Sequence, residues 1–239
     1  MFRLQSLAAL LLAALSFAAP AALRAADDAG PASGLQGKIE GRSYVSPTGT
    51  FKVTIPVLPE LGGEINDTPS VVTFEDRFNT HISIAAFAHD AMQRWELSTR
   101  GLSEYLGYFV SNFLLGDFRQ SFPGSRIESA KFGPVPGVPD GALVAYLLIP
   151  GGSMFGEKAL QLGADGQPPV AKRGNLLFVK SGHTFIVSIE LAEKVTEGKL
   201  YNKTTAQEDE ILLKRLLDVL GKIEFAKPPA VTPAADAKK

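Results

Sequence analysis

Cysteine is absent from the 239 residues of this chain. The sequence therefore has no disulfide, no thiolate metal site, no cysteine nucleophile and no cysteine to which a lipid could be attached. Stability must then come from the packing of a hydrophobic core. Charge is nearly balanced, with a formal net charge of −1, so no general electrostatic field favours nucleic acid or an acidic membrane as a partner.

Motifs for nucleotide chemistry are also missing. No glycine-rich loop ending in Gly-Lys-Ser or Gly-Lys-Thr joins a strand to a helix. The basic pairs Lys172-Arg173 and Lys214-Arg215 are isolated and too small for a nucleic-acid footprint. The acidic run at 208–210 falls at the start of a predicted helix, where the helix dipole favours negative charge, so we interpret it as structural. We expect no cofactor and no nucleic-acid partner.

Histidine is scarce, with only His81, His89 and His183. His81 and His89 share one predicted strand, and eight residues at about 3.3 Å each place them roughly 26 Å apart, too far for one metal ion. The adjacent pair His89-Asp90 is too little for a metal site. His183 borders a predicted turn, where a residue facing solvent is usual. We expect no metal-binding residue.

Ser153 is the best candidate for a nucleophile, in the run Gly-Gly-Ser-Met-Phe. A nucleophile elbow needs glycine two residues after the serine, and Phe155 occupies that place. The run therefore predicts a turn, and we assign no catalytic residue. A hydrolase with an unrecognised site, dependent on Ser153 or His89, stays open as a lesser alternative.

Residues 1–25 resemble a signal peptide, because Arg3 precedes an apolar run and small residues surround Ala25. The alternative is an uncleaved membrane anchor. The apolar run is barely long enough for the ~20 residues that a membrane span needs, and it is interrupted by Pro20, so the anchor is disfavoured. We expect cleavage and a periplasmic or secreted protein. Residues 26–42 are expected to form a disordered lead-in, 43–226 a single domain, and 227–239 a disordered tail of proline, alanine and lysine.

The run at 175–191 organises the predicted domain. Two apolar, β-rich segments are joined by Ser181-Gly182, which predicts a tight hairpin because glycine supplies the positive φ that such turns need. In the second segment Phe185, Val187 and Ile189 alternate with polar residues. The strand therefore has one apolar face, which helices or another sheet must cover.

Two amphipathic helices are available to cover the sheet. Residues 98–115 carry apolar side chains at helical spacing, with Ser98 or Thr99 as the expected cap and Gly116 as the expected end. The second helix is predicted to open with a capping box from Thr205 to Glu208 and to close at Gly221. Strands are predicted at 43–45, 51–56, 70–75, 80–88, 126–135, 142–149 and 223–225. This order favours an α+β domain, an antiparallel β-sheet covered by two main helices.

Trp95 is the only tryptophan and lies between the strand ending near residue 88 and the first helix, beside Arg94. One interpretation makes it a lid over the edge of the core. The other makes Trp95 and Arg94 a contact for a partner protein, because tryptophan and arginine are favoured at interface hot spots.

Three segments resemble the PsbP-like superfamily of exported proteins, which includes proteins of the PsbP and DcrB types. They are the run from Tyr44 to Pro56, the hairpin at 72–84 and the arm at 182–187. The resemblance spans about 43–225. It departs at 57–60, where many relatives carry a Gly-Trp or similar pair, so the subfamily stays open.

This resemblance implies an α/β/α sandwich and a non-enzymatic accessory or binding protein, and it transfers no site residue. We therefore expect an exported accessory protein of the bacterial cell envelope that binds another envelope protein. The alternative is a carrier or sensor of a small apolar ligand held between sheet and helices.

Overall fold

The computed structural model describes residues 34–157 and 169–226. The predicted signal peptide and tail, with the first part of the lead-in, lie outside these residues. Two sheets form the framework, one of seven strands in the order β4-β5-β6-β10-β9-β8-β7 and one of four in the order β1-β2-β3-β11. Each strand pairs antiparallel with its neighbours. The α+β class predicted from the sequence is confirmed.

The strands of the large sheet are β4 (Glu64–Asp67), β5 (Val71–Glu75), β6 (His81–Ala88), β7 (Arg126–Val135), β8 (Val138–Pro150), β9 (Val170–Lys180) and β10 (His183–Glu190). Those of the small sheet are β1 (Lys38–Glu40), β2 (Ser43–Val45), β3 (Phe51–Thr54) and β11 (Ile223–Phe225). The helices are α2 (Ala91–Arg100), α3 (Leu102–Phe109), the π-helix η2 (Val110–Leu114), α4 (Leu115–Ser121), α6 (Glu193–Thr196) and α7 (Thr205–Leu220), with short 3₁₀ turns η1 (Pro59–Leu61) and η3 (Gly198–Leu200).

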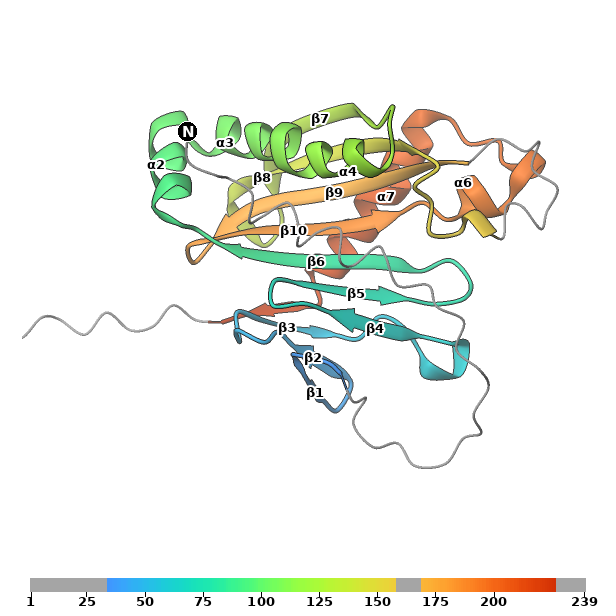
Figure 1. Cartoon of the computed structure of the whole chain (residues 1–239), viewed down its shortest axis with the longest axis horizontal. Helices are drawn as coiled ribbons and strands as arrows, with labels where there is room; N and C mark the ends of the chain where they lie inside the picture. The colour runs from blue at the N-terminus through green and yellow to red at the C-terminus, as the bar shows by residue number, and fades with distance from the viewer. Residues whose placement is uncertain (1–33, 158–168, 227–239) are drawn as a thin grey trace, which may run out of the picture.

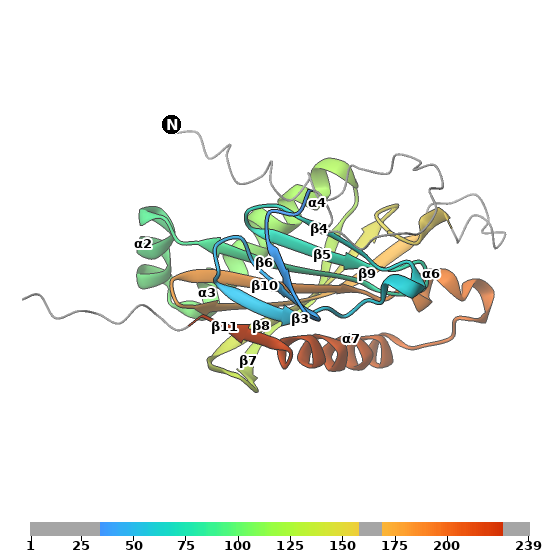
Figure 2. The same cartoon turned by 90° about the horizontal axis from the view of Figure 1, so that it is seen from below.

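Three layers result, and the views in Figures 1 and 2 show them. One face of the large sheet packs against α3, η2 and α4, in a core that includes Leu106, Phe109 and Leu177. The opposite face packs against α7 and the small sheet, in a core that includes Phe51, Phe185 and Leu212. The α/β/α arrangement is therefore present, with the small sheet sharing one outer layer with α7. No helix in the described part of the chain is long and apolar enough to cross a membrane.

The predicted hairpin is the β9–β10 pair, and β10 is the central strand of the large sheet. Both turn residues have positive φ, 48° at Ser181 and 71° at Gly182, as a two-residue hairpin turn requires. The expectation of a single apolar face on β10 is wrong, because helices also cover its other face. Thr184 and Glu190, read as polar outward residues, are fully buried there.

The first helix differs from its prediction at both ends. Helical structure begins at Ala91, capped by a reciprocal pair of hydrogen bonds between Asp90 and Gln93. Ser98 and Thr99 lie inside α2 and donate their hydroxyls to the carbonyl of Trp95 instead of capping a helix. Gly101 separates α2 from α3, because its φ of 78° is not helical and interrupts the helix. Glycine suits this position, since residues with a side chain rarely adopt a positive φ.

Beyond Gly101 the helical path continues to Ser121, past the expected end at Gly116. The π-helix η2 inserts an extra residue into the path, as such bulges do. Leu114, Leu115 and Phe118 are all buried after this insertion, so the apolar stripe stays against the sheet where a regular helix would rotate it away. The apolar stripe itself is confirmed, with Tyr105 and Leu106 at most 1% exposed.

Other boundaries also change. The lead-in expected to be disordered contains β1, which is held because the backbone N–H of Gly37 donates to the Asp67 carboxylate and Tyr44 Oη donates to it as well. The second helix is capped by Thr204 with Gln207, one residue before the predicted box. The segments 57–69 and 192–203, where the sequence predicts no helix or strand, contain η1 and β4 in the first and α6 and η3 in the second.

Candidate functional site

Helix α2 places Trp95 and Arg94 on an exposed surface at one end of the large sheet, immediately after β6 (Figure 1). Trp95 is 61% exposed, and Met92, one turn before it, is 56% exposed. A side chain so open to solvent is not a lid over the core, so this interpretation of Trp95 is wrong. Arg94 is also exposed, and its Nη1 donates to the carbonyl of His89 at 2.6 Å, which holds the arginine stem near the start of the helix.

The base of α2 is fixed by buried polar contacts. His89 Nε2 and Thr184 Oγ1 are 2.8 Å apart, and Tyr105 Oη lies 2.9 Å from the same hydroxyl. Burial lowers the pKa of His89, and the nearby charges of His183 and Arg94 lower it further. A neutral His89 therefore ties the start of α2 to β10 and α3, so the exposed surface of α2 has a rigid support.

Ser153 and His89 do not form a catalytic pair. The Ser153 hydroxyl donates to the buried Glu190 carboxylate at 2.5 Å and accepts from the backbone N–H of Phe155, the turn geometry that the sequence predicted. Ser153 is thus held at the Glu190 end of β10, while His89 bonds to residues at its opposite end. Seven residue steps along a strand separate these ends by roughly 23 Å.

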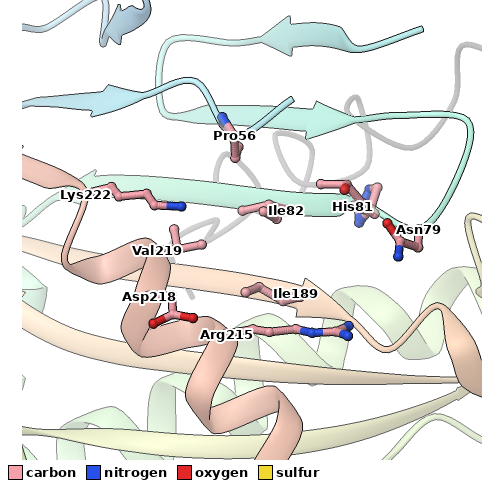
Figure 3. A pocket seen from close by; sticks show the side chains of 10 residues that line it. Pro56, Asn79, His81, Ile82, Ile189, Arg215, Asp218, Val219 and Lys222 are labelled. Atoms are coloured by element: carbon pink, nitrogen blue, oxygen red, sulfur yellow. The ribbon is translucent and has the colours of Figure 1, made fainter. Parts of the chain in front are cut away.

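A pocket of about 290 Å³ lies between the large sheet and the C-terminal half of α7. Figure 3 shows Ile82 of β6 and Ile189 of β10 on the sheet side, with the side chains of α7 facing them. It is lined by Pro56, Asn79, Thr80, His81, Ile82, Ile189, Arg215, Asp218, Val219 and Lys222. Ile82, Ile189 and Val219 are buried, so the floor is apolar while the rim is polar and charged.

The helical side of this pocket is the last part of α7 and the turn after it. Arg215, Asp218 and Val219 share one face of α7 at the spacing i, i+3 and i+4. Lys222 follows in the turn, where Gly221 keeps a helical conformation and the backbone N–H of Lys222 donates to the carbonyl of Val219. Sequence reasoning missed these residues because it treated this helix only as a cover for the sheet, the role that Leu212, Leu216 and Leu220 perform in the core. The signal available was this second, charged stripe directly beside the apolar one.

Arg215 is held in place from outside the pocket. Its Nη1 and Nη2 donate to the two carboxylate oxygens of Glu193 at 3.1 and 2.5 Å. Burial opposes ionisation of Glu193, yet the bonds from Arg215 keep the pKa of that carboxyl below its usual value. The pair is therefore ionised and neutral overall, and it orients the guanidinium at the pocket wall.

His81 closes the pocket at the start of β6, and it is 6% exposed. Burial lowers the pKa of His81 to about 3, and the charge of Arg173 contributes to the lowering. The ring is therefore neutral over the whole physiological range, and it offers a hydrogen-bonding surface without charge.

We expect acid to destabilise the fold through His81. The unfolded chain binds a proton near pH 6.5 and the folded chain near 3, so stability is complete above 6.5 and falls as the pH drops between these values. At about 1.4 kcal/mol per unit, lowering the pH to about 4.5 removes about 3 kcal/mol from the free energy of unfolding. Urea unfolding at about pH 7.5 and 4.5 measures this loss.

His81→Gln is the matched variant, because an amide keeps hydrogen-bonding capacity without titrating. Carboxylates contribute equally in both proteins, so the difference between the two pH profiles isolates the histidine. We expect the variant to lose about 3 kcal/mol less than the parent over the same interval. Parallel profiles would contradict this assignment.

A buried ionic cluster lies on the same side of the sheet, farther along α7. Lys172 of β9 is fully buried, and its Nζ lies 2.5 Å from Glu128, 3.0 Å from Glu208 and 2.6 Å from Asp209. Burial opposes the charged ammonium, but the hydrogen bonds that Lys172 donates to these carboxylates raise its pKa above the usual value. Lys172 of the basic pair thus meets Glu208 and Asp209 of the acidic run, although the two segments look unrelated in the sequence.

Glu208 is the centre of this cluster on the helix side, at 2% exposure. Lys194 Nζ and Tyr201 Oη donate to its second oxygen at 2.5 and 2.7 Å. Burial raises the pKa of Glu208, but these hydrogen bonds and those of Lys172 outweigh it and lower the pKa overall. Lys172 pairs with carboxylates of all three neighbours, so the cluster joins β7, β9 and α7.

Among residues 34–157 and 169–226, no group of three or more histidine or acidic side chains is placed to hold a metal ion. The three histidines do not converge with carboxylates at any one place in that part of the chain. The pocket beside α7 and the exposed surface of α2 are two places where the described part of the chain is open to other molecules.

No protein-family model matches the chain, and no curated protein matches it either. Among solved structures it is similar to the Ran-binding protein Mog1p of Saccharomyces cerevisiae, at 10% identity over 79% of this chain and 95% of that chain, with a TM-score of 0.43. It is also similar to cyanobacterial PsbP from Synechocystis sp. PCC 6803, at 14% identity over 80% and 98%, with a TM-score of 0.44.

A crystal structure from Bacteroides thetaiotaomicron VPI-5482 is similar at 11% identity over 79% of this chain, with a TM-score of 0.39. The chain spans half the length of that protein. The PsbP-like resemblance expected from the sequence is confirmed as a resemblance of fold only, and at these identities the activities and partners of those proteins do not transfer.

Proposed function

We propose that this chain is an exported, non-enzymatic accessory protein of the bacterial cell envelope, which binds another envelope protein through α2. The observation that carries the proposal is the pair of large apolar side chains on α2, Trp95 and Met92, exposed on a rigidly supported helix. Tryptophan, methionine and arginine are the residues enriched in interface cores. Exposure of this size on a lone tryptophan is uncommon in a residue that only stabilises a fold.

The chemistry of α2 favours one kind of partner surface. Arg94 and Arg100 are exposed basic residues of α2, whereas Glu96 is its one acidic residue and is half-buried. The partner surface we propose is an apolar recess for Trp95 with acidic side chains at its edge. Such charges steer encounter and fix the orientation of the complex more than they add affinity.

Substitution of Trp95 is expected to abolish most of this binding without unfolding the protein. Truncation of a hot-spot tryptophan costs about 2 kcal/mol or more, which is at least about a 30-fold loss of affinity. Because the side chain is exposed, Trp95→Ala should change the free energy of unfolding by no more than about 0.5 kcal/mol. Photocrosslinking from position 95 in native cells identifies the partner, and titration with that partner measures the loss.

Leu200 provides a matched control, because it is 84% exposed and lies in η3, which directly follows α6 in the chain. Figure 1 shows α6 at the other end of the large sheet from α2. The same photocrosslinker at position 200 should capture no common partner, and Leu200→Ala should leave the affinity unchanged. Equal capture from both positions, or full affinity in Trp95→Ala, would show that α2 is not the binding surface.

The alternative of a carrier for a wholly apolar ligand has less support. The aromatic stripe of α3 that motivated it is packed into the core, with Tyr105 and Phe109 at 1% and 3% exposure.

Export is also part of the proposal, because it depends on residues 1–25, which lie outside the described residues. Intact mass of the protein from its native envelope tests it, and a mass that retains residues 1–25 would refute cleavage near Ala25.

A further inference from the structure

We propose that the pocket between α7 and the sheet binds a small zwitterion with a branched apolar body, a molecule of the amino-acid class. This goes beyond binding of a protein partner and depends on a different surface. The pocket volume of about 290 Å³ is near the lower end of the range of ligand sites, which run from about 300 to 1,000 Å³. A ligand of amino-acid size fits this volume, whereas a large cofactor does not.

The apolar part of the ligand is specified by the floor. Ile82 and Ile189 come from neighbouring strands, and Val219 faces them from α7 (Figure 3). All three side chains are buried, at 8% exposure or less. Three branched side chains at the bottom of a pocket favour a branched hydrocarbon group, since burial of apolar surface is favourable and roughly proportional to area. A purely polar solute would not remove the apolar floor of the pocket from water and would gain no hydrophobic stabilisation there.

The charged part is specified by two side chains with no ion pair in the described chain. Asp218 lines the pocket from the last turn of α7 and Lys222 from the turn that follows, yet their charged atoms do not form a salt bridge. Residues four apart on a helix face have Cβ atoms roughly 5–6 Å apart. A carboxylate and an ammonium on one carbon of a ligand can bridge this interval, the first toward Lys222 and the second toward Asp218.

Charge balance selects a zwitterion over a simple anion or cation. The third charged group at the rim, Arg215, is already neutralised by Glu193, and His81 is uncharged. An anion alone would face Asp218 unpaired, and a cation alone would face Lys222 unpaired. Charge-assisted hydrogen bonds are stronger than neutral ones, so each matched charge should contribute measurably to affinity.

Calorimetric titration with three probes of one carbon skeleton tests the proposal. L-leucine carries both charges, 4-methylpentanoate lacks the ammonium group and isoamylamine lacks the carboxylate. We expect leucine to bind with a Kd below about 1 mM and each of the other two at least about tenfold more weakly. Lys222→Met and Asp218→Asn should each weaken leucine binding at least about tenfold.

Lys214→Met and Glu210→Gln are the matched controls, because both residues are exposed on α7 outside the pocket. Their leucine affinity should equal that of the parent protein. The proposal is overturned if leucine shows no binding up to about 10 mM, if either single-charge probe binds as tightly as leucine, or if the control variants weaken binding as much as the pocket variants. Because Trp95→Ala leaves the pocket intact, it should bind leucine normally whether or not α2 binds a protein.

Discussion

Lys172→Met is expected to destabilise the protein by about 3–5 kcal/mol, because it leaves Glu128 and Asp209 without their counter-ion, while Lys194 still pairs with Glu208. The ammonium contacts Glu128, Glu208 and Asp209, and Glu208 is nearly as buried as the lysine. A methionine side chain has similar length, so the loss reflects charge more than volume. The free energy of unfolding in urea at neutral pH measures it.

A second substitution separates the charge effect from packing. Adding Asp209→Asn to Lys172→Met removes one of the stranded charges, so the double variant should recover part of the loss. Lys214→Met, an exposed lysine on α7, should change stability by no more than about 0.5 kcal/mol. A loss under about 1 kcal/mol in Lys172→Met would mean that water or side-chain rearrangement relieves the carboxylates.

Phe185→Ala is expected to cost about 3–5 kcal/mol as well, by opening a cavity between the two sheets. Phe185 is 1% exposed and stacks on Phe178 with ring centroids 5.3 Å apart. Phe51 and Phe225 of the small sheet meet its edge at centroid distances of 6.3 and 5.0 Å. One side chain of the central strand thus joins both sheets, and urea unfolding again measures the loss.

The size of the cavity can be varied to test this explanation. Phe185→Leu keeps most of the apolar volume and should cost clearly less than the alanine variant. Trp95→Ala removes a larger aromatic group from an exposed position and should leave stability almost unchanged. If Phe185→Leu proved as damaging as Phe185→Ala, ring geometry and not cavity volume would be the cause.

Local patterns in the sequence correctly predicted those elements whose structure is determined by neighbouring residues alone. The turn at Ser181-Gly182, the apolar stripe through Tyr105 and Leu106, and the closing strand at 223–225 all appear where expected. Each depends on a period or on turn chemistry that short-range geometry determines. The same logic failed at Ser98, since a better cap was available at Asp90 and Gly101 divides the helix.

Features that depend on the meeting of distant segments could not be predicted. Lys172 and Glu208 come from β9 and α7, and only the fold brings their charges into contact. The pocket arises in the same way. Nothing in the sequence distinguishes Ile82 and Val219 from other apolar residues, and only the fold places them on opposite sides of one pocket. Trp95 was singled out from composition, but its exposure follows from the projection of α2 beyond the sheet (Figure 1).

The pairing of β11 with β3 has a consequence for how the chain acquires its fold. These strands lie near opposite ends of the described residues, so their antiparallel register closes a loop that encloses almost the whole domain. A polypeptide delivered residue by residue from its N-terminus holds β3 with an unpaired edge until Phe225 arrives. Contacts of such long sequence separation slow folding. The complete native fold therefore forms only after the whole domain has emerged. Until then the chain is a partly folded intermediate in which β3 lacks its partner β11, and chaperones and proteases encounter this intermediate.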